Sequence, residues 1–564
     1  FLGDQVFLFS SFDVSTLNGT NGFIIRGISA EEKLGSMLSY AGDFNHDGID
    51  DILVGDNFNP MGKGTAFIFY GKNSGFQPLY NRNDIDNTKG LFITLDSALT
   101  TKVTDVSYAG DVNHDGIADI IITENISSKA NYYIVFGSIS INNLNTSALS
   151  GTNGLTIKGY SETSSGIGST ARNAGDINND GIDDVIMGCP SYREGFDYNT
   201  GRVAVIFGKN LTFPSSIQLE TLSNPDGFTI TNTGSYNNLG KSVAAAGDFN
   251  HDGIDDFILG IPGKNLTGKN SVGEAYVVFG RNTFPSTFTI ESINASTGVI
   301  FQGTKEGSEF GFNVEGIFDV NNDGKSDIAI SSKRGITYNG SVYIVFGGNT
   351  ATGIVNEKTI LNTVGYQIFD SYDGYSTAFF GYDVAGIRDF NQDGKNDFIL
   401  GYVRRDEYYW DKGNAYIFYG EKMDRIDAVK PTITCPPTQE LFANSSLPDY
   451  VSYLPDLIDN CTYINNSDLI VTQNPPQGTF FTADTNVTIT VTDLSGNTNS
   501  CTFLVKLKSP PPSPTCNTFN YSLGNLDGSN GFVINGENGT VNMGYSVSKA
   551  GDINGDGITD FIVS

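Results

Sequence analysis

The chain has 564 residues, a formal net charge of −30 at pH 7 and 67 glycines. A chain of this length exceeds what one hydrophobic core supports, so we expect several domains or a repeat architecture. The negative charge disfavours binding to nucleic acid and to anionic membranes. No apolar run is long enough to predict a membrane-spanning helix. Frequent glycine, phenylalanine and tyrosine, without helix-period stretches, predict an all-β protein.

The first residues, GDQVFLF at 3–9, form a short aromatic strand pattern, and the chain begins at Phe1 without a signal-like segment. We therefore expect a mature, processed or partial chain. The next pattern, SYAGDFNHDGIDDILVG at 39–55, combines two strands with a polar loop between them. This loop is the first copy of a motif that dominates the sequence.

The motif is Asp-x-Asn-x-Asp-Gly-x-x-Asp, and its seven copies do not vary at the aspartate, asparagine and glycine positions. Oxygen donors at positions 1, 3, 5 and 9, with the carbonyl of position 7, suit Ca2+, and glycine at position 6 allows a sharp turn. No glutamate stands at position 12 and a strand pattern follows each loop, so we expect calcium on β-hairpins and not in EF-hands. Seven bound ions would offset 14 negative charges.

The predicted metal ligands, loop by loop, are Asp43, Asn45, Asp47, Ile49 and Asp51; Asp111, Asn113, Asp115, Ile117 and Asp119; Asp176, Asn178, Asp180, Ile182 and Asp184; Asp248, Asn250, Asp252, Ile254 and Asp256; Asp319, Asn321, Asp323, Lys325 and Asp327; Asp389, Asn391, Asp393, Lys395 and Asp397; and Asp552, Asn554, Asp556, Ile558 and Asp560.

The loops start 68, 65, 72, 71 and 70 residues apart, and the last follows after 163. Each period also holds a strand such as GFIIRG at 22–27 and an aromatic strand such as FIFYG at 67–71. Four strands per period predict a β-propeller.

These residues resemble the FG-GAP repeat of integrin α-subunits, including its G-A-P step at Gly260-Ile261-Pro262 and Gly188-Cys189-Pro190. The resemblance covers roughly 1–425 and 525–564. It implies a seven-bladed propeller with calcium on the hairpins of one face. Integrins usually fill only some blades with calcium, whereas all seven qualify here.

The segment at about 430–508 interrupts the period with PTITCPP (431–437), DNC (459–461) and SGNTNSCTFLV (495–505). These phrases resemble the HYR (hyalin repeat) module, an immunoglobulin-like β-sandwich of extracellular adhesion and matrix proteins. The resemblance implies a disulfide between Cys461 and Cys501. The family's usual partner for Cys435 is missing, and we expect Cys516 to replace it. Cys189 is left over, as a buried thiol or an intermolecular link.

A Pro-rich linker at 509–516 precedes a C-terminal half-blade at 525–564 that ends where the aromatic strand should begin. The seventh blade is therefore divided between the two ends of the chain. Three readings stay open: closure within one molecule, completion of the ring of the next molecule, or an arbitrary cut in a longer tandem protein. The second would be head-to-tail and would propagate into a filament.

Extracellular localisation, secreted or attached to the cell surface, is favoured by the cysteine pattern together with N-x-Ser/Thr sequons. The sequons are at Asn18, Asn125, Asn145, Asn210, Asn265, Asn294, Asn339, Asn444, Asn465, Asn486, Asn520 and Asn538. The histidines His46, His114 and His251 all occupy position 4 of a calcium loop, where we expect solvent-facing turn residues.

The sequence shows no catalytic motif, and we expect no enzyme. Our first hypothesis is a calcium-loaded structural glycoprotein that assembles with itself into a fibre by sharing the divided blade. The alternative is an integrin-like or lectin-like module that binds an extracellular protein or glycan. A weaker third hypothesis, suggested by the resemblance, is an accessory domain of a surface enzyme, because some FG-GAP propellers accompany phospholipases.

Overall fold

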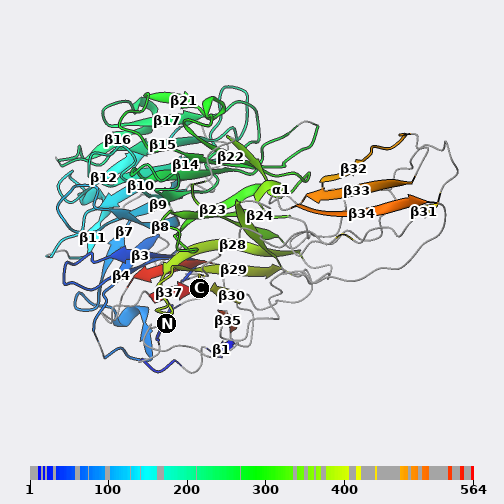
Figure 1. Ribbon diagram of the computed structural model, residues 1–564. Coiled ribbons are helices and arrows are strands. Elements are labelled where there is room, and N and C mark those ends of the chain that lie inside the picture. Colours follow the sequence, from blue (N-terminus) through cyan, green and yellow to red (C-terminus); the bar gives the residue numbers. More distant parts are fainter. Residues whose placement is uncertain are drawn as a thin grey trace. The chain divides into compact units, whose positions relative to one another are not determined.

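We analysed a computed structural model of the chain (Figure 1). It describes residues 11–13, 17–19, 22–28, 34–56, 64–73, 75–95, 102–126, 129–139, 142–161, 170–210, 212–266, 268–334, 340–348, 353–360, 364–369, 377–405, 414–420, 433, 439–440, 470–479, 484–492, 498–506, 531–535, 546–551 and 560–563. The chain divides into two compact units. One comprises 1–357, 365–422 and 522–564, and the other 358–364 and 423–521.

Six antiparallel four-stranded sheets build most of the larger unit, and each begins with the strand that precedes a predicted calcium loop. The sheets are β3 (Met37–Gly42), β4 (Asp51–Asp56), β5 (Thr65–Phe69), β7 (Gly90–Thr94); β8 (Lys102–Gly110), β9 (Asp119–Ile126), β10 (Lys129–Val135), β12 (Gly154–Lys158); β13 (Thr170–Gly175), β14 (Asp184–Cys189), β15 (Arg202–Ile206), β17 (Gly227–Thr231); β18 (Val243–Gly247), β19 (Asp256–Ile261), β20 (Glu274–Val278), β22 (Gly298–Gln302); β23 (Phe310–Phe318), β24 (Asp327–Ser332), β25 (Ser341–Val345), β27 (Gly365–Phe369); and β28 (Thr377–Arg388), β29 (Asp397–Arg405), β30 (Asn414–Phe418), β35 (Gly531–Asn535).

The first strands of these sheets lie side by side in a ring, each contacting the next, from β3 through β8, β13, β18 and β23 to β28. The ring is closed by β36 (Val547–Gly551), which contacts both β28 and β3. β36 pairs with β37 (Asp560–Val563). The predicted all-β propeller is confirmed, and within the described residues the strand that closes its ring belongs to the same chain.

The C-terminal segment supplies strands to two blades, whereas we predicted a single half-blade at 525–564. β35 pairs with β30 and completes the sixth sheet, so that sheet lacks its fourth strand without the segment. β36 and β37 then begin the seventh position. The N-terminal pattern at 3–9 lies outside the described residues. β2 (Ile24–Arg26), on the N-terminal side, belongs to a separate two-stranded sheet.

A short strand from the following repeat lies parallel to the outer strand in five of the six sheets, all except the sheet that begins with β23, and a sixth such strand lies on β2. The additions are β11 (Leu144–Asn145) on β7, β16 (Ser216–Gln218) on β12, β21 (Thr287–Thr289) on β17, β26 (Ile354–Asn356) on β22, β1 (Ser11–Asp13) on β35 and β6 (Leu79–Asn81) on β2. One helical turn follows most of them: η3 (Arg82–Asp84), η4 (Thr146–Ala148), η5 (Leu219–Thr221), η6 (Ile290–Ser292) and α1 (Glu357–Thr359). These strands cover edges that would otherwise invite intermolecular pairing.

The smaller unit contains a sheet of four strands, in the order β31 (Gln439–Glu440), β34 (Thr498–Lys506), β33 (Thr485–Thr492) and β32 (Ile470–Asn474). Alternate residues of β33 and β34 face a small core, in which Val487, Ile489 and Val505 are fully buried. Such alternation is expected of a sheet with one buried face.

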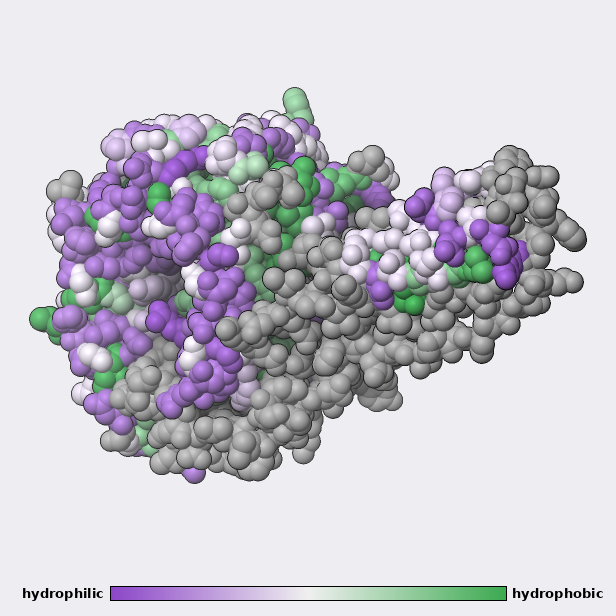
Figure 2. All heavy atoms as spheres, viewed as in Figure 1, coloured by the Kyte–Doolittle hydropathy of each residue, from purple (hydrophilic) through white to green (hydrophobic). Residues whose placement is uncertain are grey.

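Apolar side chains fill the spaces between neighbouring sheets of the larger unit. One cluster joins Ile121 and Ile134 of the second sheet to Val185 and Met187 of the third, and it includes Cys189, which is 4% exposed. Cys189 is a reduced, buried thiol, which agrees with the first of its two open interpretations. The visible surface of the described residues is mainly hydrophilic, with isolated hydrophobic residues (Figure 2).

Two phenylalanines near the third blade allow a matched test of this packing. Phe228 is fully buried and stacks on Phe284 with 4.4 Å between ring centroids, whereas Phe196 is 93% exposed. We expect Phe228→Ala to destabilise the protein by about 3–5 kcal/mol, because it leaves a cavity. Phe196→Ala should change the unfolding free energy by less than about 0.5 kcal/mol. Urea unfolding of both variants measures the difference, and equal effects would contradict the assigned core.

Candidate metal-binding loops and the central channel

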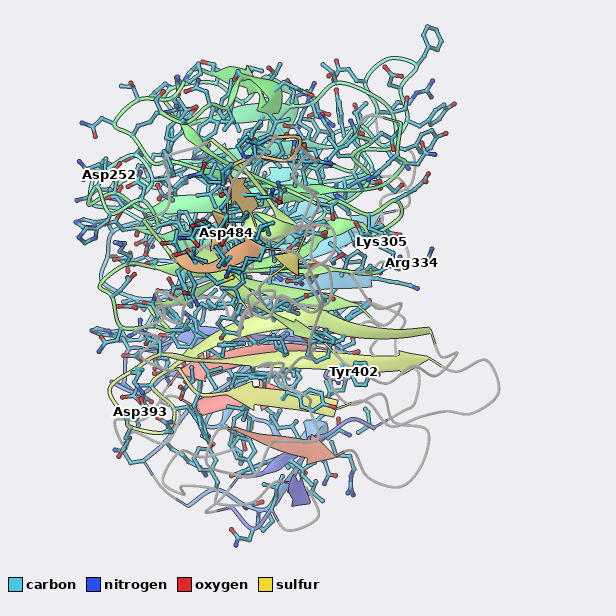
Figure 3. All side chains as sticks on the ribbon, turned by 45° about the vertical axis from the view of Figure 1, so that its right-hand side comes forward. Asp252, Lys305, Arg334, Asp393, Tyr402 and Asp484 are labelled. Atoms are coloured by element: carbon cyan, nitrogen blue, oxygen red, sulfur yellow. The ribbon has the colours of Figure 1, made fainter. Side chains whose placement is uncertain are left out.

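The six described loops share one backbone conformation. Position 4 is left-handed in each, with φ of 57° at His46, 58° at His114 and 64° at His251. The glycine at position 6 also has positive φ, between 83° and 89° in these loops. The side chains of His46 and His251 are more than half exposed, which agrees with the predicted turn role. Figure 3 shows position-5 residues Asp252 and Asp393 on one side of the propeller, away from Lys305 and Arg334.

Side chains at positions 1, 3 and 5 accept hydrogen bonds from the loop's own backbone. In the third loop, Asp176 accepts from the N–H groups of Asp180 and Gly181 at 3.0 and 2.8 Å, and Asp180 accepts from that of Ile182 at 3.0 Å. The same bonds recur in the other described loops. The backbone therefore fixes where the predicted ligands lie.

The aspartate at position 9 is fully buried and links the loop to the third strand. Asp184 accepts from the N–H of Ile177 at 3.1 Å and from that of Gly208 at 2.9 Å. A Cβ atom at Gly208 would lie 2.3 Å from the carbonyl oxygen of Asp183. Only glycine fits this place, which gives a physical reason for the aromatic-Gly ending of each third strand. Equivalent clashes occur at Gly137, Gly280, Gly347 and Gly420.

These buried carboxyl groups are electrostatically unfavourable by themselves. Burial, reinforced by the carboxylates of the same loop, raises the pKa of Asp184 and Asp256 to about 8. The pKa of Asp327 rises to about 8 and that of Asp397 to about 7 for the same reasons. Asp51 and Asp119 have pKa values well above the usual range. A cation beside each group would relieve this cost.

The donor chemistry fits a hard cation. Each loop offers carboxylate, amide and main-chain carbonyl oxygens, the ligands that Ca2+ prefers, and no sulfur or nitrogen ligand. Within the described residues no cluster of three or more His, Cys, Asp and Glu side chains is close enough to hold a metal ion. An ion in these loops would thus depend on the amide and main-chain oxygens as well. Asp552, Asn554, Asp556 and Ile558 of the seventh loop lie outside the described residues, and Asp560 begins β37.

Two loops differ from the others at position 7, where lysine replaces isoleucine. The Lys395 ammonium lies 3.0 Å from Asp393, and that of Lys325 lies 3.6 Å from Asp323. Each lysine therefore neutralises the position-5 carboxylate of its own loop. A divalent cation should bind more weakly to these two loops than to the four with isoleucine.

In the third and fourth loops, the aspartate at position 8 connects its blade to the preceding one. Asp183 accepts a hydrogen bond from the N–H of Asp111 in the preceding loop at 2.8 Å, and Asp255 accepts from that of Asp176 at 3.1 Å. The loop motif leaves position 8 open, and these aspartates are not among the predicted ligands. Because position 1 is itself a predicted ligand, an ion in one loop would reinforce the contact with the following blade.

The described sequons are mostly accessible. Asn18, Asn145, Asn210, Asn265, Asn294 and Asn486 are exposed, and Asn125 is partly buried on β9. Asn339, Asn444, Asn465, Asn520 and Asn538 lie outside the described residues, as do Cys435, Cys461 and Cys516. Cys501, on β34, is disulfide-bonded, and its predicted pairing with Cys461 stays a prediction.

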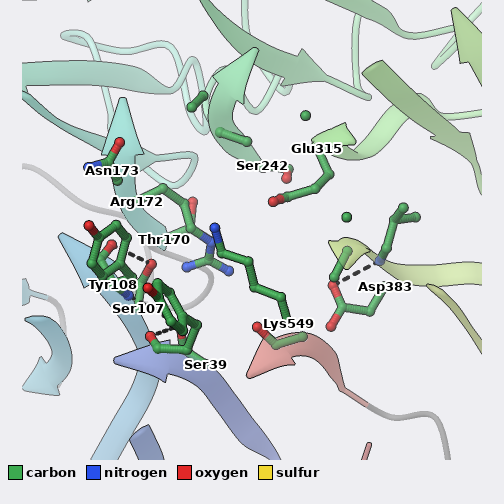
Figure 4. Close-up of a pocket in the computed structure, with 18 of the residues that line it drawn as sticks. Ser39, Ser107, Tyr108, Thr170, Arg172, Asn173, Ser242, Glu315, Asp383 and Lys549 are labelled. Atoms are coloured by element: carbon green, nitrogen blue, oxygen red, sulfur yellow. Dashed lines mark hydrogen bonds between the residues drawn. The ribbon is translucent and has the colours of Figure 1, made fainter. Parts of the chain in front are cut away.

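The seven innermost strands surround a central channel of about 690 Å³. Figure 4 shows Arg172, Glu315, Asp383 and Lys549 pointing into it. Arg172 forms an ion pair with Asp105 on the neighbouring strand. None of these residues was predicted from the sequence, because the strands that supply them are far apart along the chain. Aligning the innermost strands on their calcium loops would have revealed the uneven charge of this layer.

Burial governs the titration of the channel groups. It raises the pKa of Glu315 to about 8, although Arg172 acts in the opposite direction. It raises the pKa of Asp383 to about 6, against the effects of the Val547 N–H and Arg172. It lowers the pKa of Lys549 to about 8, and Arg388 adds to this effect. In the channel, the pKa of each buried acid or base is therefore set by desolvation together with the charges of the others.

Comparison with known proteins identifies both repeat types. A model of the FG-GAP repeat matches residues 173–206, 239–278 and 310–345, and a model of the HYR domain matches 426–507. Integrin alpha pat-2 of Caenorhabditis briggsae is 32% identical over 208 residues, which is 34% of this chain and 15% of that integrin. Integrin alpha-8 of Homo sapiens is 29% identical over 162 residues, which is 28% of this chain and 14% of that integrin.

A second kind of relative carries the name of an enzyme. Phosphatidylinositol-glycan-specific phospholipase D of Dictyostelium discoideum is 29% identical over 231 residues, 38% of this chain and 23% of that protein. The chain thus matches less than a quarter of each of these three relatives. No helix among the described residues has the length and apolarity to cross a membrane.

The position-7 lysines predict two classes of calcium site. In an isothermal calcium titration, the fifth and sixth loops should bind more weakly than the loops with isoleucine. Lys395→Ile should move one ion from the weaker to the tighter class, because it removes the ammonium beside Asp393. His251→Ala, at an exposed position 4, should leave the titration unchanged. A single class of sites in the unaltered protein would contradict the prediction.

The raised pKa of Glu315 predicts a pH dependence. The folded protein holds this proton more tightly than the unfolded chain, whose carboxyl has a pKa near 4.5. The resulting stability is present below that value and is lost as the pH rises through about 8. Glu315→Gln should therefore melt at a higher temperature than the unaltered protein at pH 9, with little difference at pH 5. The exposed Glu306→Gln serves as the control, and the same shift in both variants would refute the assignment.

Proposed function

We propose, from the FG-GAP repeats and the HYR domain that this chain carries, that it is an extracellular, calcium-binding glycoprotein of adhesion or structural assembly. The integrin relatives and the HYR domain support a location outside the cell or on its surface. The oxygen-only loops and their buried carboxylates support calcium as the resident ion. The exposed sequons support N-glycosylation.

Calcium would act on rigidity and not on chemistry. In each of six loops the ion would be held by the residues at positions 1, 3, 5, 7 and 9. The aspartate at position 9 is the buried one of this set. A ligand that binds only the folded form stabilises it by mass action. Because Asp183 and Asp255 bond to the preceding loops, this stabilisation would extend across two of the junctions between blades.

We further propose that the chain assembles into a fibre. The division of the seventh blade between the two ends of the chain supports this part of the proposal. The seventh position takes β36 and β37 from the C-terminal segment, whereas β2 belongs to the N-terminal side. The short strand β1 also pairs with β35 of the C-terminal segment, with Ser11 opposite Val533. This pairing would form equally well between two chains, and contacts made head-to-tail would propagate into a filament.

A second candidate function, recognition of an extracellular protein or glycan, is favoured by aromatic loops at the end of the strands opposite the calcium loops. Phe196 and Tyr236 are 93% and 62% exposed, and the N–H of Tyr236 donates to the carbonyl of Tyr198 at 2.7 Å. Exposed aromatic side chains on an ordered loop are frequent binding anchors. Loss of glycan or protein binding in a monomeric Tyr236→Ala variant would support this function.

We propose no catalytic role. The carboxylate pairs of the sequence, such as Asp183 and Asp184, have structural partners: Asp183 accepts from the preceding loop, and Asp184 from two backbone amides of its own blade. The phospholipase relative matches through a limited region, which is compatible with a propeller that accompanies an enzyme.

Mixing differently labelled chains tests the assembly. A donor dye on the N-terminal end of one population and an acceptor on the C-terminal end of another should show energy transfer in millimolar calcium. Electron microscopy should then show filaments. Val547→Asp should abolish both, because Val547 is 3% exposed in an apolar cluster. The control Ile139→Asp changes a residue that is 71% exposed.

The opposite outcome is equally clear. A chain that carries both dyes serves as the comparison. If energy transfer occurs within such chains but not between the two singly labelled populations, and the protein sediments as a monomer at all concentrations, each ring closes on itself. The assembly proposal would then be refuted, and the binding function would lead.

A further inference from the structure

The strand β36 is held in the ring by three different contacts. The first is apolar: Val547 packs in a cluster with Ala385, Ile387 and Ile417 of the sixth blade, and this cluster also includes Leu17. Val547 thus occupies a hole between β28 and the N-terminal side of the chain. Any segment placed here must offer an apolar side chain at this position.

The second contact is a hydrogen bond from the backbone. The N–H of Val547 donates to Oδ2 of Asp383 at 2.9 Å. The other oxygen, Oδ1, accepts from Nδ2 of Asn313 at 3.2 Å and from the N–H of Val384 at 3.2 Å. The carboxylate is therefore positioned by the fifth and sixth blades, independently of β36.

The third contact involves Lys549, which reaches across the channel. Its ammonium nitrogen lies 4.9 Å from the ring centroid of Tyr40, 5.1 Å from that of Phe318 and 5.8 Å from that of Tyr108. The three rings come from the first, fifth and second blades. A cation is attracted to an aromatic face, and this attraction strengthens where water is excluded.

Charged groups of both signs surround this aromatic cage. Glu315, Asp50 and Asp183 attract the ammonium, and Arg388 opposes it. The hydroxyl of Tyr40 donates to Asp50 at 3.1 Å, which orients this ring. The guanidinium of Arg388 lies over Phe318 at 5.3 Å. The site is thus suited to a single alkylammonium group.

Lys549 also differs from its counterparts in the other repeats. Three residues before position 1, the other six innermost strands carry Tyr40, Tyr108, Asn173, Ala245, Gly316 and Gly386. No other copy of the repeat places a cation there. A strand from another repeat could supply the backbone bonds, but it could not fill the cage.

We propose that the ring position between β28 and β3 is a sequence-specific receptor for the segment 546–549, in which Lys549 is the residue that is recognised. The partner is the C-terminal strand of this chain, and it can come from the same molecule or from a second copy. Only the second-copy part rests on the proposed fibre function. The receptor supplies the order of assembly, because it accepts β36 and rejects the innermost strands of the other repeats.

Substitution of Lys549 in the full-length protein tests the receptor. Lys549→Met keeps the length of the side chain and removes the charge, so it should lower the melting temperature in calcium by several degrees. Lys549→Ala should also melt early, and n-butylammonium at millimolar concentration should restore part of its stability, whereas n-butanol should not. Lys241→Met is the control, since Lys241 lies over Phe312 in the same channel but outside β36. Equal melting of Lys549→Met and the unaltered protein would overturn the proposal.

A peptide competition avoids dependence on the folding of the variants. A fluorescent peptide of residues 543–564 should bind the unaltered protein at least tenfold more tightly than the same peptide with methionine at 549. Equal affinities of the two peptides would overturn the receptor. If the lysine peptide wins but the protein never forms filaments, recognition stands and the fibre function fails. If filaments form equally well with Lys549→Met, the fibre function stands and recognition fails.

Discussion

The structure depends on one buried carboxyl group in each of the six described loops. The aspartate at position 9 joins three parts of the repeat: the loop that carries it, the residue after position 1 and the glycine that ends the third strand. The geometry of the hairpin, and with it the position of the blade, follows from these two hydrogen bonds. Burial opposes the ionised form of the same group and raises its pKa, and a cation beside it would relieve this cost.

The channel shows the same principle on the scale of the whole ring. Each blade contributes one strand to it, and charges from different blades balance each other, as Arg172 and Asp105 do. Closing the ring brings desolvated charged groups together. The cost of their desolvation and the stabilisation from their mutual attraction both fall on the innermost strands. The strand β36 is the last to be supplied along the chain, and Lys549 completes the set of charges.

Local patterns predicted more of this structure than long-range ones. The predicted calcium loops could be recognised because nine consecutive residues determine their turn, down to the left-handed position 4 and the glycine at position 6. The strands of each blade and the HYR module followed from repetition and from motif. The outer parallel strands, such as β16 on β12, were missed because three residues in a connecting segment carry no pattern of their own.

The channel residues and the fourth strand of the sixth blade were missed for a related reason. Glu315 and Lys549 meet only when the ring closes, and nothing near either residue in the sequence indicates the other. Residues 531–535 lie in the predicted half-blade at 525–564, but their pairing with the sixth blade was not predicted, since the inserted module separates them from β30 by more than a hundred residues. Residues that are distant in sequence can be recognised as neighbours only when the three-dimensional structure gives the pairing of their strands.

The place of the insertion has a mechanical consequence. The module enters the chain after β30 and leaves it before β35, and these strands are antiparallel neighbours with Phe418 opposite Gly531. The two attachment points are therefore one strand spacing apart, about 5 Å. A pulling force applied through the module would act across this pair and open its hydrogen bonds one after another, starting from the attached end. Force applied along the ring would instead load many bonds at once, so the sixth blade is the point at which tension would first separate the strands.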